Sequence, residues 1–129
     1  MIIVILEQSN SLIDLVTALQ ESAWNLNEKQ INQINKIWSK LLEFDAQFTI
    51  QSQLSIPEFA SFLNHDVLSP LTVVMGYAEL FRSIYSPSLN EIQIEIVESI
   101  CTLTQQMTDK ILELREEMVA KRHALAQTV

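Results

Sequence analysis

The residues best suited to chemistry lie close together in the segment Phe59–Leu80. His65 is followed directly by Asp66, and Ser69 lies four residues after the histidine. A neutral imidazole that faces water keeps one free nitrogen lone pair, which can attack an electrophile such as a phosphoryl group. A neighbouring carboxylate can accept the other ring proton during transfer. The pattern therefore favours a nucleophilic histidine with Asp66 as its acid–base partner, although a surface histidine beside an acid more commonly has no role.

The surrounding pattern predicts a helix that presents His65 to water. The apolar positions Phe59 and Leu63 mark the inner side of this helix, and His65 lies away from them. Ser69 shares the face of His65, where its hydroxyl could hold a water or contact a phosphoryl oxygen. Pro70 removes a backbone donor and crowds the carbonyl of Asp66, so a bend is expected there.

Composition predicts an all-α protein, and the length is typical of a single domain. The 129 residues include one glycine, Gly76, and three prolines, so material for tight turns is scarce. Hydrophobic residues make up 48%, which is typical of a globular core. The apolar periodicity predicts helices from Ile2 or Ser11 to Trp24, from Glu28 to Phe48, from Ser55 to Tyr85 and from Leu89 to Ala126.

Capping residues and connectors support these boundaries. Asn27 with Gln30 forms a predicted capping box, and Ser55 caps the third helix. Thr49–Leu54 is interpreted as a connector, with Ser9 or Asn10 as a cap if the first helix begins at Ser11. The short turn Ser86–Ser88 makes the last two helices antiparallel. We divide the chain into a helical extension, residues 1–54, and a helical hairpin, residues 55–129.

The last helix carries a long apolar stripe that needs several partners. Its 37 or so residues would extend roughly 55 Å, more than one antiparallel helix can cover. The hairpin is therefore expected to pair with a second copy as a dimeric four-helix bundle. The alternative is a monomeric bundle that the first two helices complete. The stripe comprises Ile92, Ile96, Ile100, Leu103, Met107, Ile111, Leu114 and Met118.

Charge and special residues argue against several classes of function. Sixteen acidic against eight basic residues give a net charge of −8, which disfavours nucleic acid and anionic membranes as partners. The single Cys101 rules out an intrachain disulfide and is expected in the core. Met1–Leu6 is apolar but short and lacks a basic flank, so neither a signal peptide nor a membrane span is expected, and a cytoplasmic location follows.

Other polar or sulfur-containing side chains indicate no second site. His123, beside basic residues near the C-terminus, is expected to be solvated, and its distance from His65 gives no metal-ligand spacing. No cofactor or metal is predicted. The remaining methionines and the tryptophans are interpreted as packing residues; they are Met75, Met107, Met118, Trp24 and Trp38.

The histidine segment resembles the phosphoacceptor box in the dimerisation and phosphotransfer domain of two-component sensor histidine kinases. The resemblance is specific over about 25 residues, and the helical hairpin extends it to 55–126, leaving 1–54 outside. The matching residues, in order, are Phe59, His65, Asp66, Ser69, Pro70, Leu71, Val74, Gly76, Tyr77 and Leu80.

The resemblance implies a role for each matching polar residue. His65 would be phosphorylated, Asp66 would be its acid–base partner, and Ser69 would stand where the family places a residue that assists dephosphorylation of a response regulator. It also implies a dimeric four-helix bundle that acts in two-component signalling and phosphorelay. The expected partners are a response-regulator receiver domain, a sensor histidine kinase, or both.

The chain departs from the family at two places. Leu68 stands where members usually carry Arg or Lys, a cation that could help hold a phosphoryl group. The ATP-binding domain that follows the hairpin in the kinases is not found, and no glycine-rich loop could cradle phosphates. We therefore expect a phosphotransferase-like protein and no autonomous kinase. The alternatives are a non-catalytic module that binds a kinase or regulator, and a fragment of a larger kinase.

Overall fold

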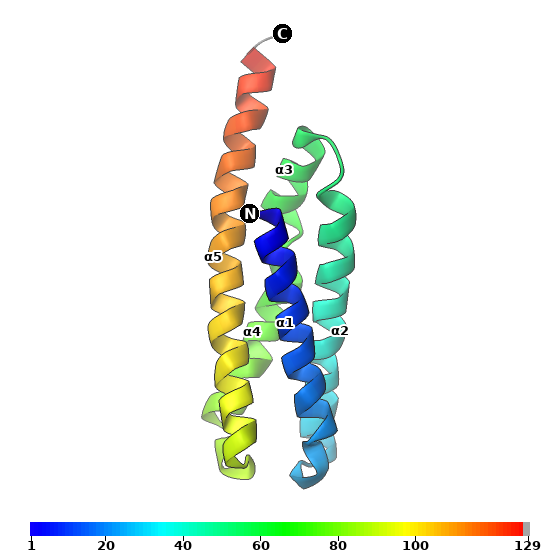
Figure 1. Cartoon of the computed structure of the whole chain (residues 1–129), viewed down its shortest axis with the longest axis vertical. Coiled ribbons are helices and arrows are strands. Elements are labelled where there is room, and N and C mark those ends of the chain that lie inside the picture. Colours follow the sequence, from blue (N-terminus) through cyan, green and yellow to red (C-terminus); the bar gives the residue numbers. More distant parts are fainter. Residues whose placement is uncertain (128–129) are drawn as a thin grey trace.

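The computed structural model describes residues 1–127, and all regular secondary structure in this range is helical (Figure 1). The predicted all-α class with a long antiparallel hairpin is confirmed. Residues 128 and 129, the last two of the predicted hairpin domain, lie outside the described residues. The α-helices are α1 (Ile2–Glu21), α2 (Glu28–Gln51), α3 (Ile56–His65), α4 (Leu68–Ser83) and α5 (Glu91–Gln127), with 3₁₀ turns at Ala23–Asn25 and Ser86–Ser88.

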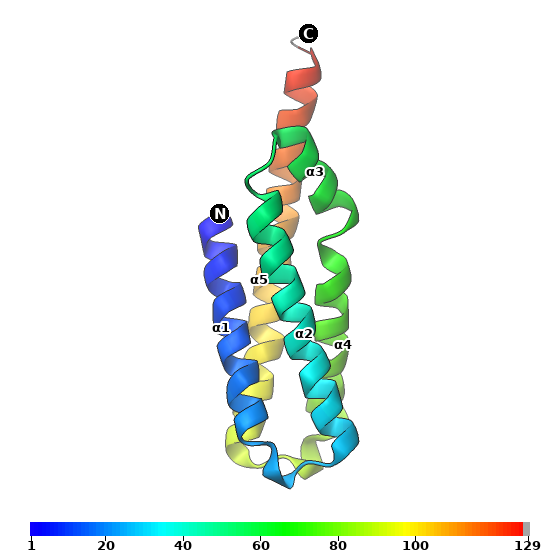
Figure 2. The same ribbon diagram turned by 90° about the vertical axis from the view of Figure 1, so that its right-hand side faces the viewer.

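The helices form an up-and-down four-helix bundle within one chain. Helix α1 packs against α2 and α5, α2 packs against α4, and α5 packs against both α3 and α4 (Figures 1 and 2). Helices α1 and α2 thus cover the inner side of the hairpin made by α3, α4 and α5. This is the single-chain arrangement that the sequence offered as the alternative. The homodimer stays a prediction, because one chain does not test it.

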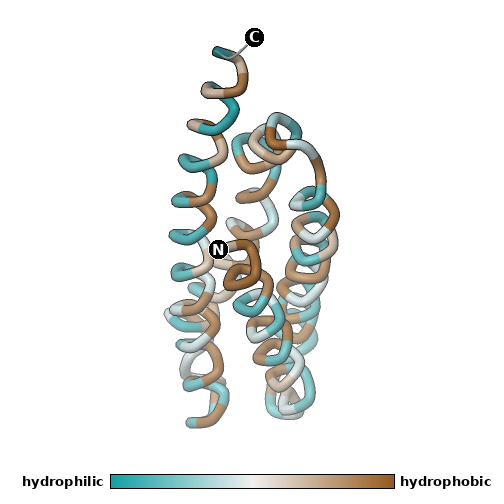
Figure 3. The backbone as a smooth tube through the Cα atoms, turned by 45° about the horizontal axis from the view of Figure 1, so that its top comes forward, coloured by the Kyte–Doolittle hydropathy of each residue, from teal (hydrophilic) through white to brown (hydrophobic). Residues whose placement is uncertain are grey.

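The amphipathic patterns explain why these helices pack together. Apolar and polar residues alternate along each helix (Figure 3), and one side of each is buried. The largest fully buried side chains come from α1, α2, α3, α4 and α5: Ile5, Leu12, Leu19, Ile34, Ile37, Leu41, Phe44, Phe48, Leu63, Phe81, Ile100 and Met107. Burying such side chains contributes about 1.5–3 kcal/mol each, which drives association of the helices.

The predicted helix starts are confirmed where side chains cap them. Asn27 accepts from the Gln30 backbone at 2.8 Å, and the Gln30 side chain accepts from the Asn27 backbone at 3.0 Å. Ser55 accepts from the Glu58 backbone at 3.4 Å, with Pro57 in the first turn of α3. These bonds satisfy amide donors that a helix start otherwise leaves unpaired.

The predicted helix from Ser55 to Tyr85 is two helices, with Asp66 and Val67 between them. The backbone amides of Asp66 and Val67 both donate to the carbonyl of Phe62, at 3.0 and 3.2 Å. Pro70 then falls in the first turn of α4, where its missing N–H costs nothing. The expected bend is therefore a complete break, and His65 ends α3.

Other boundaries moved for local reasons. Helix α1 begins at Ile2, so Ser9 is not a cap; it is buried, and its hydroxyl donates to Asp45 of α2 at 2.9 Å. Helix α2 runs past Phe48 to Gln51, because Phe48 is buried and continues its apolar side. The connector predicted from Thr49 is correspondingly shorter.

The predicted stripe on α5 is wrong in its first turns, where Ile92 is 68% exposed. Gln93 turns inward instead and donates to the Ser22 carbonyl and to Asn25, both at 2.7 Å. This polar anchor rotates the start of α5, so that Val97, Cys101 and Thr104 are buried further along. Trp24, expected to pack, is 86% exposed beside the same anchor.

Within residues 1–127, α1 is the one helix long and apolar enough to cross a membrane by length and composition. Here one side of it, with Ile5, Leu12 and Val16, is buried against its neighbours. The expectation of no membrane partner remains a prediction.

Candidate functional site

The three predicted site residues gather at the break between α3 and α4. His65 is the last residue of α3, Asp66 follows it, and Ser69 lies in the first turn of α4. All three side chains are exposed, whereas Pro70 is buried. The imidazole thus reaches solvent, as the helical pattern predicted.

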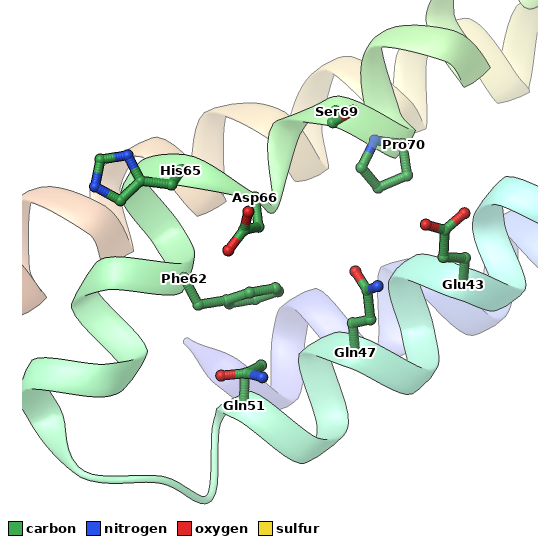
Figure 4. Close-up of a pocket in the computed structure, with 8 residues that line it drawn as sticks. All are labelled: Glu43, Gln47, Gln51, Phe62, His65, Asp66, Ser69 and Pro70. Atoms are coloured by element: carbon green, nitrogen blue, oxygen red, sulfur yellow. The ribbon is translucent and has the colours of Figure 1, made fainter.

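These residues line one pocket of about 390 Å³ together with residues of α2 (Figure 4). A water molecule occupies roughly 30 Å³ of liquid, so the pocket has room for a group larger than a single water. Its walls come from two separate parts of the chain. The lining residues are Glu43, Gln47, Gln51, Phe62, His65, Asp66, Ser69 and Pro70.

The histidine and the acid point in different directions. In Figure 4 the Asp66 carboxylate points into the pocket toward α2, and the His65 ring points away from it. Within residues 1–127 no hydrogen bond engages the side chain of His65, Asp66 or Ser69, so each is free to turn. Exposed side chains change rotamer in picoseconds to nanoseconds. The acid–base role of Asp66 and the role of Ser69 therefore stay predictions.

An aromatic cluster fixes the end of α3 against α2. The Phe48 ring lies 5.8 Å from that of Phe59 and 6.5 Å from that of Phe62, and 5.4 Å from that of Phe44 on its own helix. Such ring pairs are worth about 0.5–1.5 kcal/mol beyond burial alone. Phe62 also lines the pocket, so the cluster sets the distance between α2 and the turn that carries His65.

The pocket is acidic and contains no cation. Its charged side chains are the carboxylates of Glu43 and Asp66, and no Lys or Arg lines it. Glu43 pairs with Lys40, 3.1 Å away and three residues earlier in α2. The neutral donors are the amides of Gln47 and Gln51 and the hydroxyl of Ser69. An anionic group in the pocket would thus find neutral donors but also two carboxylates that repel it.

Leu68 lines a different hollow, a groove between α4 and α5. This groove measures about 280 Å³, and Leu68 is half-buried against the core at its edge. Gly76 also lines it, and a Cβ added there would meet nothing within 4 Å. Packing inside this chain therefore does not require glycine at that position.

His123 does not line the pocket beside His65. His123 is exposed near the end of α5. No group of three or more metal-ligating side chains within residues 1–127 is placed to hold a metal ion.

The α2 wall of the pocket was missed from the sequence. Glu43, Gln47 and Gln51 recur every four residues, a spacing that places them on one face of a helix. Glu43 and Gln47 each directly precede a buried phenylalanine, Phe44 and Phe48, so the spacing was a signal for a polar stripe beside the apolar one. It could not show which part of the chain this stripe would face.

A family model described as the His Kinase A (phospho-acceptor) domain matches residues 57–117. The match spans α3, α4 and most of α5, and it leaves α1 and α2 outside. It confirms the resemblance that the segment around His65 indicated. No curated protein and no solved structure matches the chain.

Proposed function

We propose that this chain, which contains a His Kinase A (phospho-acceptor) domain at residues 57–117, is a phosphotransfer intermediate that accepts a phosphoryl group on His65. The domain supports a phosphoacceptor role in two-component signalling. The observation that carries the proposal is the position of the one histidine in that range, exposed at a helix end and beside an acid. No ATP-binding part is needed if another protein supplies the phosphoryl group.

The transfer needs only the imidazole and a donor. A ring nitrogen of His65 attacks the phosphorus of a receiver's aspartyl phosphate, an N–P bond forms, and the acyl C–O–P linkage breaks to release the receiver carboxylate. The second ring nitrogen gives its proton to Asp66 or to water. In reverse, a receiver carboxylate attacks the phosphohistidine, and the ring regains its lone pair.

A receiver domain would dock on the outer side of α3 and α4. This side is left uncovered by α1 and α2, which pack on the opposite side of the hairpin. The groove beside α4, with Leu68 and Gly76 at its edge, lies on the outer side and could accept an apolar segment. The net charge of −8 favours a partner with a positive rim and disfavours anionic membranes and nucleic acid as partners. We propose a cytoplasmic location.

The test is transfer from a phosphorylated receiver domain to the whole chain. Intact-mass measurement at neutral pH should find one added phosphoryl group on the wild type and none on His65→Ala. Equal labelling of both, or no label on the wild type with any receiver or kinase of the same cell, would count against the proposal.

The second candidate is a non-catalytic module that binds a kinase or a receiver. The absence of a cation from the residues that line the pocket favours it, as does the apolar Leu68 in the groove. A His65→Gln variant with full cellular activity would support this function over transfer.

A further inference from the structure

We propose that Gln47 and Gln51 of α2 bind the phosphoryl oxygens of phosphorylated His65. Helix α2 would then complete the phosphoacceptor site, although it lies outside the matched domain. This inference rests on the proposed function, since it requires His65 to carry the phosphoryl group.

The first support is position. Gln47 and Gln51 lie one helical turn apart on α2, and both line the pocket that His65, Asp66 and Ser69 line from the other side. Figure 4 shows the Gln47 amide directed from α2 toward the space below Asp66. The edge-on contact of the Phe48 ring with Phe59 and its tilted contact with Phe62 hold this wall against α3.

The second support is the set of neutral hydrogen-bond donors in the pocket. A phosphorylated side chain carries about −1.5 to −2 charges near neutral pH, and the pocket already holds the carboxylates of Glu43 and Asp66. Each glutamine offers two N–H donors, and a hydrogen bond to an ionised acceptor is about twice as strong as a neutral one. The two amides and Ser69 are thus the side chains of the pocket that can donate to the phosphoryl group.

The third support is that these donors are uncommitted. Within residues 1–127 no hydrogen bond engages the side chain of Gln47 or Gln51, so neither amide must leave a partner. His65 likewise has none, and its ring can turn from the outward position in Figure 4 into the pocket. The outward ring would meet the receiver, and the inward ring would hold its phosphoryl group against α2.

The test uses a small donor, so that receiver docking plays no part. With phosphoramidate, a ring nitrogen of His65 attacks phosphorus and the donor's P–N bond breaks. The second ring nitrogen gives up its proton, which water carries to the leaving nitrogen, and ammonia departs. The whole chain is compared with Gln47→Glu, which keeps the shape but replaces the donors by a charge, and with Gln47→Leu. Gln53→Glu adds the same charge at an exposed site outside the pocket.

Phosphorus NMR gives the fraction of phosphohistidine at a fixed donor concentration. We expect Gln47→Glu to lower the phosphorylated-to-free ratio about tenfold, the ratio that about 1.4 kcal/mol produces. Gln47→Leu should lower it less, and Gln53→Glu should match the wild type. Thermal unfolding of each variant checks that the fold is intact. We expect midpoints close to that of the wild type, because these positions are exposed.

A second readout distinguishes binding from a structural effect. On phosphorylation, the side-chain N–H resonances of Gln47 should shift, and those of Gln53 should not. If His65 is labelled but the Gln47 variants match the wild type and the amide signals stay in place, this inference fails and the proposed function stands. If the wild type is not labelled, or if His65→Ala is labelled as strongly as the wild type, both this inference and the proposed function fail.

Discussion

The property of His65 that matters most is that no other described residue holds its side chain by a hydrogen bond. The ring has no hydrogen-bond partner within residues 1–127 and lies where α3 ends, so both ring nitrogens can be used. Asp66 follows it and points into the pocket (Figure 4). In the proposed transfer, the open question for this site is which group takes the ring proton when the N–P bond forms.

Asp66→Asn should slow phosphoryl acceptance by about 10²-fold, the lower end of what general acid–base catalysis contributes. The amide keeps the shape of the side chain but cannot accept a full proton. The measurement is the initial rate of phosphohistidine formation from a phosphorylated receiver, with exposed Asp14→Asn on α1 as control. An unchanged rate for Asp66→Asn would mean that water takes the proton.

Cys101 provides a pH test of the core. Burial raises the pKa of its thiol above the usual 9.0, and the carboxylate of Glu79 raises it further. Only the thiolate reacts with alkylating reagents, so labelling of the folded chain at pH 8 should be much slower than in urea. Since the folded pKa is raised, the stability it contributes is present below pH 9 and is lost as pH rises through the folded value. Equal labelling rates in the two states would contradict this burial.

Helix α4 contains a glycine that the chain does not need for packing. Gly76→Ala should stabilise the protein by about 0.5–1 kcal/mol, because glycine costs conformational entropy in a helix and the added Cβ meets nothing. Urea unfolding measures the change in the free energy of unfolding. Ala46→Gly, at an exposed position of α2, should lower that free energy. A loss of stability in Gly76→Ala would contradict the open space around an added Cβ.

The packing of α3 against α2 depends on the Phe48 ring. Phe48→Ala should cost about 3–5 kcal/mol, because the Phe48 side chain is fully buried and contacts three other rings. Urea unfolding again measures the cost, with exposed Thr49→Ala as control. A cost below about 1 kcal/mol would mean that the cluster does not hold the pocket walls.

Local patterns in the sequence predicted helices and caps, but not how separate helices face one another. The Asn27–Gln30 box and the Ser55 cap were predictable because their partners lie three residues apart. The exposure of Ile92 was not predictable, because it results from the hydrogen bond between Gln93 and Asn25, which lie 68 residues apart in the chain. Gln47 was missed for the same reason, since its place in the pocket depends on how α2 packs.

In the whole molecule, the first two helices pack on the hairpin formed by α3, α4 and α5. Helices α1 and α2 bury the inner side of α4 and α5, the side on which the sequence predicted a second copy to pack. A homodimer of the full chain must therefore use another side or displace this pair.

Removing residues 1–54 should make the hairpin associate more strongly than the full chain of 14.8 kDa. The cut exposes buried apolar side chains such as Val74, Phe81 and Met107, whose burial in a dimer is favourable. Sedimentation of both chains over a range of concentrations measures the difference. A shortened chain that associates no more than the full one would show that α1 and α2 do not replace a partner.

The most direct test is the site of phosphorylation in the full chain. After incubation with a phosphorylated receiver, peptide mass analysis at neutral pH should find one phosphoryl group, located on His65 and absent from His65→Ala. A phosphoryl group on any other residue, or a wild type that stays unlabelled while the receiver loses its phosphate no faster than alone, would contradict the account.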